Sequence, residues 1–300
     1  MPWIQLKIDS DKTHAEKLAD LLSELGAAAV TLEDRADQPI FEPPPGATPL
    51  WQDVCVVGLF AAEADPRAII TQLERQSGLA LVWQASPLED KDWERAWMDN
   101  YHPIQFGPRL WICPSWSAPP DPSAINLMLD PGLAFGTGTH PTTALCMQWL
   151  DAHPPQDLEV IDFGCGSGIL AIAALLLGAK HCVGVDIDPQ ALYASRMNAE
   201  KNAVADRLTL CLPPQAPRAP ADLLIANILA NPLIELASHF GTLVRPGGHL
   251  VLSGILREQA EQVSRAYQPH FEMQAPVIKE DWVRLEGRRK YDNVDANASR

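Results

Sequence analysis

A segment with alternating glycines constrains the fold of this chain more than any other feature. Residues 160–163 form an apolar run that contains Asp162, glycine occupies every second position of residues 164–168, and residues 169–174 are only alanine, leucine and isoleucine. The pattern predicts a buried parallel strand, a tight turn and a helix, in that order. Glycine suits such a turn because it adopts positive φ angles and leaves room for a ligand against the main chain.

An acidic residue follows this turn at the spacing typical of a ribose-binding carboxylate. The next apolar run ends at Asp186, 22 positions after Gly164 (186 − 164). Nucleotide-binding folds place a ribose-binding carboxylate about 20 residues after such a turn. The helix that starts after the turn also offers unpaired N–H groups and the positive end of its dipole. Together these features predict a nucleoside site.

The glycine spacing bears on which nucleoside is bound. The dinucleotide pattern G-x-G-x-x-G would need glycine where the chain has Ile169, and from Gly166 only its alanine form is met, by Ala171. The form D-x-G-x-G-x-G, with Asp162 before the first glycine, resembles motif I of the S-adenosylmethionine-dependent methyltransferases. Their ligand has no pyrophosphate and carries an ammonium that Asp162 can approach. A nicotinamide site and a turn that binds nothing are the alternatives.

The charge balance bounds the class of partner. The 300 residues carry a formal net charge of −15 and are 47% hydrophobic, which fits a globular protein of two domains. Such an acidic chain is poorly suited to the phosphate backbone of nucleic acids and favours a basic protein as its partner. Residues 1–86 hold 13 acidic and 6 basic side chains and residues 87–100 hold 5 and 2, so two-thirds of the excess lies in the first third.

The cysteines and the apolar runs indicate where the protein works. The 6 cysteines are scattered, with no C-x-x-C and no paired histidines at metal-binding spacing, which predicts free thiols in a reducing compartment and no metal site. The start of the chain lacks a charged segment followed by an apolar core, and the longest apolar run, residues 169–177, has nine residues. We therefore expect a cytoplasmic protein without a membrane span.

Residues 1–86 predict a domain with the element order β-α-β-β-α-β. The expected strands are 3–8, 27–32, 54–60 and 80–84, and the expected helices are 15–25 and 66–76. This order is that of the ferredoxin-like α+β fold. The segment holds no catalytic cluster, so we expect it to serve in recognition or docking.

Residues 87–100 predict a charged linker helix. Trp93 and Trp97 lie on one face of it at i, i+4, and we expect both to pack against a domain. Short strands are expected next, at residues 103–106 and 110–114.

Residues 130–143 hold three glycines and four threonines just before a helix expected at 144–150, with Pro141 in its first turn. A flexible loop beside a helix N-terminus suits a ligand lid or cradle, and the absence of a following lysine excludes a P-loop. His140 is interpreted either as a base or, more commonly for such a residue, as a hydrogen-bonded loop histidine.

From residue 181 onward strands and helices alternate. Strands are expected at 181–186, 208–212, 223–226, 249–253 after a Pro-Gly-Gly turn, 273–279 and 282–286, and helices at 189–202, 233–240 and 258–267. Such alternation predicts a mostly parallel sheet with helices on both faces, which binds ligands at the carboxyl ends of its strands. Gly164, Asp186 and Asn227 all stand at such ends. Residues 291–300 are expected to be disordered, and no role is assigned from Arg288 onward.

Asn227 opens the third stretch with chemistry, Asn227-Ile228-Leu229-Ala230-Asn231-Pro232. Many amino-group methyltransferases carry Asn/Asp-Pro-Pro-Tyr at this place, where carbonyl oxygens accept hydrogen bonds from the target nitrogen. An aromatic residue there would stack on a planar target, so its absence suits a flexible aliphatic amine. The alternative is that Asn227 merely caps the next helix.

Residues 129–143, 162–168 and 227–229 together resemble the bacterial methyltransferases of ribosomal protein L-eleven (L11), and the likeness extends over essentially the whole chain. The resemblance implies a mobile N-terminal substrate-binding domain and a linker helix. After them, at residues 101–290, it implies an α/β domain of the Rossmann-like class I methyltransferase type, with a seven-stranded, mostly parallel sheet.

The same resemblance implies S-adenosylmethionine as cofactor and L11 as protein substrate, methylated on lysine ε-amines and on its N-terminal α-amine. By motif, Thr143, Gly164, Asp186 and Asn227 would contact the cofactor, Gly166 is expected to do so from the same turn, and Asn227 would orient the amine. We also expect a monomer that does not bind nucleic acid directly. The competing classes are a nucleic-acid methyltransferase, a nicotinamide oxidoreductase and a non-catalytic cofactor-binding module.

Overall fold

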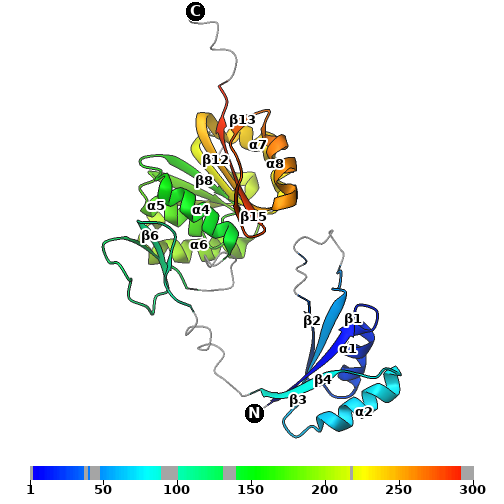
Figure 1. Ribbon diagram of the computed structural model, residues 1–300. Helices are drawn as coiled ribbons and strands as arrows, with labels where there is room; N and C mark the ends of the chain where they lie inside the picture. The colour runs from blue at the N-terminus through cyan, green and yellow to red at the C-terminus, as the bar shows by residue number, and fades with distance from the viewer. Residues whose placement is uncertain are drawn as a thin grey trace, which may run out of the picture. The chain divides into compact units, whose positions relative to one another are not determined.

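The computed structural model describes residues 3–36, 40, 48–88, 101–130, 140–216 and 219–291. The chain forms two compact units, Met1–Asp99 and Asn100–Arg300. Figure 1 shows both, the first in blue to cyan and the second in green to red. The linker helix expected at residues 87–100 lies almost wholly outside the described residues, and so do Trp93 and Trp97.

The first unit has the expected β-α-β-β-α-β order. Its elements are β1 (Trp3–Asp11), α1 (Ala15–Glu24), β2 (Ala29–Asp34), β3 (Asp53–Ala61), α2 (Pro66–Ser77) and β4 (Trp83–Leu88). The strands form an antiparallel sheet in the order β2-β3-β1-β4. Leucine and isoleucine side chains of α1 and α2 join those of β1 in one buried cluster. The ferredoxin-like prediction is therefore confirmed.

The last strand of this unit begins later than predicted. Helix α2 ends at Gly78, which adopts φ +77° and donates its N–H to Glu74. The N–H of Leu81 then bonds to the side chain of Glu74 at 3.0 Å, and pairing with β1 begins only at Trp83. The apolar residues before Trp83 thus belong to the connection, which periodicity alone does not distinguish from a strand.

The second unit is an α/β domain. Its elements are β5 (Ile104–Gln105), β6 (Leu110–Cys113), β7 (Ile125–Met128), α4 (Pro141–Ala152), β8 (Glu159–Phe163), α5 (Ile169–Leu176), β9 (His181–Val185), α6 (Pro189–Lys201), β10 (Leu208–Cys211), β11 (Ala221–Asn227), α7 (Ala230–Leu243), β12 (Val244–Leu256), α8 (Ala260–Tyr267), β13 (Phe271–Met273), β14 (Val277–Lys279) and β15 (Trp282–Arg289). A small separate sheet has the order β5-β6-β7.

The main sheet has the order β10-β9-β8-β11-β12-β15-β13, with β14 paired to β15. The strands from β10 to β12 are parallel to one another, and β15 is antiparallel to β12 and β13. From β8 the chain builds first toward β10 and then, through β11, toward the other edge. The carboxyl ends of β8 and β11 therefore flank the switch point where such sheets bind ligands.

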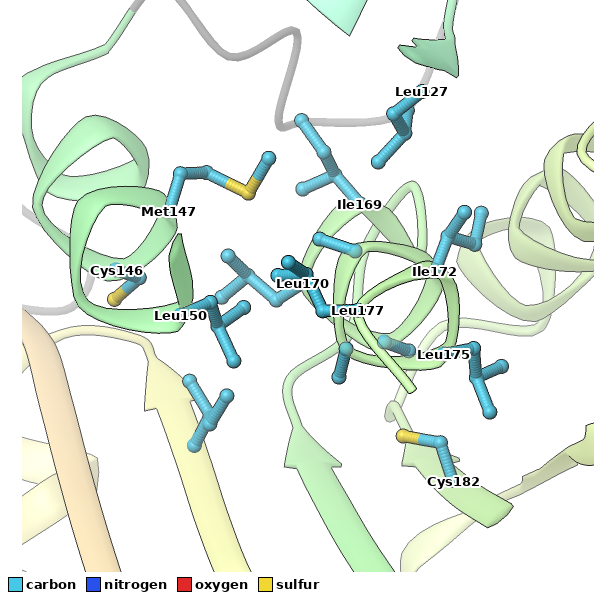
Figure 2. Packing of buried hydrophobic residues seen from close by; sticks show 14 of the residues in the cluster. Leu127, Cys146, Met147, Leu150, Ile169, Leu170, Ile172, Leu175, Leu177 and Cys182 are labelled. Carbon is cyan, nitrogen blue, oxygen red and sulfur yellow. The ribbon is translucent and has the colours of Figure 1, made fainter. Parts of the chain in front are cut away.

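Helices cover both faces of this sheet (Figure 1). On one face α5 is buried along nearly its whole length, because its sequence is apolar all round. Figure 2 shows this packing, with Met147 and Leu150 of α4 and Leu127 of β7 facing Ile169 and Leu170 of α5. A second cluster, formed with α7 and α8, fills the other face. This double-sided core fixes the sheet on which the site is built.

Several strands of the second unit differ from the prediction. The single strand expected at residues 273–279 is two short strands, β13 and β14, each paired with β15. Strand β7 was not anticipated, because its four residues follow a proline-rich stretch and are recognisable only through their parallel pairing with β6. Strand β12 begins at Val244 rather than after the Pro-Gly-Gly turn. The turn lies within the strand, where the pairing with β11 shifts between Ala221 and Leu223.

The prediction that no role can be given from Arg288 onward is wrong for its first residues. Arg288 donates to the carbonyl of Gly247 at 3.1 Å, and Arg289 donates to that of Gly241 at 2.8 Å. Lys290 donates to the carbonyl of Gln268 at 2.6 Å. Gly241 and Gln268 lie at the C-terminal ends of α7 and α8, where cationic side chains are favourable. Residues 292–300 lie outside the described part of the chain.

Three expectations concern cysteines, membranes and metals. All six cysteines are free, and five of them are buried. No helix within the described residues is long and apolar enough to cross a bilayer. Within the same residues, no group of three or more His, Cys, Asp or Glu side chains gathers at metal-binding distance.

Candidate functional site

The predicted glycine turn follows β8 at the switch point of the sheet. Gly164, Gly166 and Gly168 have φ angles of +80°, +53° and +79°, the left-handed region that glycine tolerates. Gly168 is the N-cap residue of α5. The strand, turn and helix predicted from the sequence are therefore all present.

Side chains from the next helix hold this turn in place. Ser195 donates to the carbonyl of Gly166 at 2.8 Å, and Asn198 donates to the carbonyl of Ser167 at 2.9 Å. Both lie on α6, three positions apart on one face. Sequence reasoning did not find these two residues. Their only signal is a pair of polar side chains at helical spacing shortly after Asp186.

Asp186 meets the turn from the end of β9. Its Oδ2 accepts the N–H of Gly166 at 2.8 Å and its Oδ1 accepts the N–H of Asp188 at 3.0 Å. The residue is half-buried, so the remaining lone pairs of the carboxylate are open to a ligand. Ile187, next in the chain, is 82% exposed and offers an apolar contact beside it. A hydrogen-bond acceptor beside an apolar side chain fits a ribose with an attached base.

Asp162 lies deeper than its predicted role requires. It is fully buried, and its Oδ2 accepts the N–H of Ala171, in the first turn of α5, at 3.0 Å. Its Oδ1 is also buried and has no hydrogen-bond partner among the described residues. Burial raises the pKa of Asp162 to about 7. The carboxyl group thus braces the helix after the turn, contrary to the expectation that it approaches the ammonium of a ligand.

Thr143 and Asn227 come together although 84 positions separate them. The Nδ2 of Asn227 donates to the Oγ1 of Thr143 at 3.4 Å. Thr143 is fully buried in the first turn of α4, and Asn227 is the last residue of β11. The N-cap of α7 is Leu229, without a side-chain cap hydrogen bond. The alternative that Asn227 caps this helix is therefore wrong.

His140 is the N-cap residue of α4. Its Nδ1 accepts the N–H of Thr142 at 3.3 Å, and its ring lies edge-on to that of Trp282 with centroids 4.8 Å apart. Partial burial lowers the pKa of His140, which favours the neutral ring that can accept this hydrogen bond. These contacts support its interpretation as a structural loop histidine.

Most of the threonine and glycine loop, residues 131–139, lies outside the described residues. Its first anchor is described: Asp130 accepts the N–H of Ser115 at 2.7 Å and pairs with Lys201 at 2.5 Å. Asn202 binds both the N–H and the carbonyl of Met128, at 2.7 and 2.8 Å. The loop therefore starts from a point fixed to the end of α6.

A sheet of this order, a glycine turn at its switch point, and a carboxylate and an asparagine at the neighbouring strand ends define a class I S-adenosylmethionine-dependent methyltransferase. The family profile described as "Ribosomal protein L11 methyltransferase (PrmA)" matches residues 2–290. The chain belongs to this family.

Relatives and a solved structure agree with this assignment. A protein of Marinobacter nauticus named ribosomal protein L11 methyltransferase is 59% identical over 97% of this chain and 99% of its own length. One of Shewanella sediminis with the same name is 57% identical over 97% of this chain and 100% of its own. The crystal structure of a ribosomal protein L11 methylase from Lactobacillus delbrueckii subsp. bulgaricus is 33% identical, with a TM-score of 0.58, and covers 64% of this chain and all of its own.

Proposed function

We propose that this protein uses S-adenosylmethionine to methylate amino groups of ribosomal protein L11. The finer part of the proposal is that the target nitrogens are lysine ε-amines and the N-terminal α-amine. The observation that carries it is the position of Asn227, whose side chain stands at the carboxyl end of β11 and is held by Thr143. Family membership supports the substrate, and the absence of an aromatic residue after Asn227 supports an aliphatic amine.

The residues that would hold the cofactor fit its chemistry. Asp186 would accept hydrogen bonds from the two ribose hydroxyls, and Gly164 and Gly166 would allow close approach to the main chain. Ile187 would contact the base. When bound, S-adenosylmethionine supplies a methyl group already activated by its sulfonium.

Asn227 has a defined role toward the amine. Because its Nδ2 donates to Thr143, its Oδ1 is the atom that presents an acceptor to a substrate N–H. A lysine amine has a pKa of about 10.4 and is protonated near neutral pH. Burial beside a positive charge lowers that pKa, so the amine loses its proton to solvent before attack. Asn227 then orients the lone pair and need not be a strong base.

Recognition of the protein substrate is proposed to lie in residues 1–86, followed by the linker of residues 87–100. This region holds 18 acidic and 8 basic side chains and none of the three motifs with chemistry. A basic partner would be attracted by that charge.

We also propose that the protein is a monomer, that it acts in the cytoplasm and that it does not bind nucleic acid directly. The net charge of −15 disfavours binding to a phosphate backbone, and six free cysteines agree with a reducing compartment.

The test is mass spectrometry of purified L11 after incubation with the protein and S-adenosylmethionine. We expect mass increases in steps of one methyl group, mapped by fragmentation to lysine side chains and to the N-terminal amine. The matched control is Asn227→Ala. Methylation of ribosomal RNA, or of carboxyl or hydroxyl groups of L11, would contradict the amine proposal.

A further inference from the structure

A β-bulge lies in β12 beside the end of β11. Leu252 of β12 pairs with Leu285 of β15, and Ile255 pairs with Val283, so β12 has one residue more than β15 between these pairs. Gly254 lies in this interval with φ +83°. Glycine in the left-handed region is typical of such bulges, which often occur next to active sites. Sequence reasoning gave no role to Gly254.

Ile228, the residue after Asn227, lies directly against Gly254. A Cβ atom at Gly254 would be 2.3 Å from the carbonyl oxygen of Ile228 and 2.8 Å from its carbonyl carbon. These are main-chain atoms, which cannot move aside as the end of a side chain can. The main chain of Ile228 can therefore take this course only because Gly254 has no side chain.

The other side of Ile228 faces the glycine turn. A Cβ atom at Gly164 would be 2.2 Å from Cγ2 of Ile228. Ile228 is thus held between two left-handed glycines, by its side chain against the turn after β8 and by its main chain against the bulge of β12. Contact with Gly164 involves the predicted cofactor turn, whereas contact with Gly254 does not.

The strand register ties this arrangement to Asn227. In the parallel pairing of β11 and β12, Asn227 lies opposite Ser253, so the residues that follow each of them are Ile228 and Gly254. Ser253 is fully buried and donates to the carbonyl of Val283 at 3.3 Å, which anchors the bulge to β15. The course of the chain immediately after Asn227 is therefore set by β12.

We propose that Gly254 is a positioning residue for methyl transfer, which fixes the main chain at Ile228 and thereby the direction in which Asn227 presents its side chain to the amine. The inference rests on the proposed function, because it assigns Asn227 to the amine. It adds that Ile228 contacts two glycines with different roles. Gly164 belongs to the cofactor turn, and Gly254 fixes the main chain that orients Asn227.

The experiment replaces Gly254 by alanine in the full-length protein and uses Gly247→Ala as the control. Gly247 is in the same strand with φ +78°, so alanine meets the same left-handed strain there. Its Cβ atom would meet only the ring end of Tyr291, a flexible side chain, at 2.6 Å. Calorimetry with S-adenosylhomocysteine gives the dissociation constant, and single-turnover labelling of L11 gives the transfer rate.

We expect Gly254→Ala to lower the transfer rate by about a hundredfold, the loss associated with misplacing a reacting group by about 1 Å. The dissociation constant should change by less than about threefold, because the cofactor turn is not touched. Gly247→Ala should keep both values near wild type. An unchanged rate in folded Gly254→Ala, or a loss of rate matched by an equal loss of affinity, would overturn the inference.

A second variant covers the case in which Gly254→Ala does not fold. Ser253→Ala removes the hydrogen bond that anchors the bulge to β15, and we expect a lower rate with nearly unchanged cofactor affinity. A normal rate in this variant would likewise overturn the inference. Failure of the proposed function is a separate result, since the wild-type protein would then leave the amines of L11 unmodified.

Discussion

Both units of the chain pack helices against a β-sheet, but they differ in the relative direction of their strands. In the first unit all neighbouring strands are antiparallel. Amino and carboxyl ends of strands therefore alternate along each end of the sheet. In the second unit β10, β9, β8, β11 and β12 are parallel, and their carboxyl ends meet at one edge. Gly164, Asp186 and Asn227 all lie at that edge.

This difference explains why the predicted site residues lie together in the second unit. In a parallel sheet, residues that are far apart in sequence lie side by side at the carboxyl ends of the strands, next to helix N-termini. The antiparallel unit has no such arrangement, and its sequence is instead rich in acidic side chains. The comparison predicts that catalysis and recognition can be separated by variants in one unit or the other.

The largest effect should come from removing the first unit. A protein that begins at Tyr101 keeps Thr143, Gly164, Asp186 and Asn227, so it should bind S-adenosylmethionine with near wild-type affinity. Transfer to intact L11 should fall by about a hundredfold or more, because the segment proposed to recognise L11 is lost. Calorimetry and label incorporation over a salt series measure both properties, and salt should weaken capture only in the full-length protein. Full transfer by the folded shortened protein would place recognition elsewhere.

Asn227→Ala should slow transfer by about ten- to a hundredfold and weaken binding of L11 much less, since orientation matters most in the transition state. The melting temperature should change little, because Asn227 does not cap α7. Single-turnover rates and thermal melting on one preparation test this. Asn231→Ala, at an exposed position on α7, is the matched control. A lowered melting point with an unchanged rate would restore the capping interpretation.

Asp186→Ala should raise the dissociation constant of the cofactor by well over tenfold. Hydrogen bonds from a carboxylate to ribose hydroxyls contribute about 1.5–3 kcal/mol each. Asp188→Ala is the control, since Asp188 caps α6 by accepting the N–H of Gln190 at 2.8 Å. That variant should lose about 1 kcal/mol of stability but keep its affinity. Wild-type affinity in folded Asp186→Ala would refute the nucleoside assignment.

The smallest effect concerns pH. Burial raises the pKa of Asp162 from 3.8 to about 7, so the folded state holds a proton that the unfolded state has released above about pH 4. The free energy of unfolding should therefore fall by about 3 kcal/mol from this group as pH rises from 5 to 8.5, with most of the loss complete near pH 7. Asp162→Asn should remove that part of the slope in urea titrations. An equal slope in both proteins would show that Asp162 does not hold the proton.

The features that could be predicted from the sequence are local, whereas those that could not depend on contacts between distant segments. The glycine turn and Asp186 were predictable because local patterns encode them. The contacts of Ser195 and Asn198 with the turn depend on how α6 lies on the sheet, and the role of Gly254 depends on the register of β12 with two neighbours. Such long-range pairings leave no periodic signal in one sequence.

The position of β15 has a consequence for how the protein is made. Residues 282–289 come late in the sequence, yet β15 lies between β12 and β13 in the finished sheet. During synthesis the earlier strands emerge first, and the sheet stays open at β12 until β15 arrives. Such long-range pairing is slow to form. A protein that acts on a ribosomal component should therefore complete its own domain only after nearly all of residues 101–291 have left the ribosome that makes it.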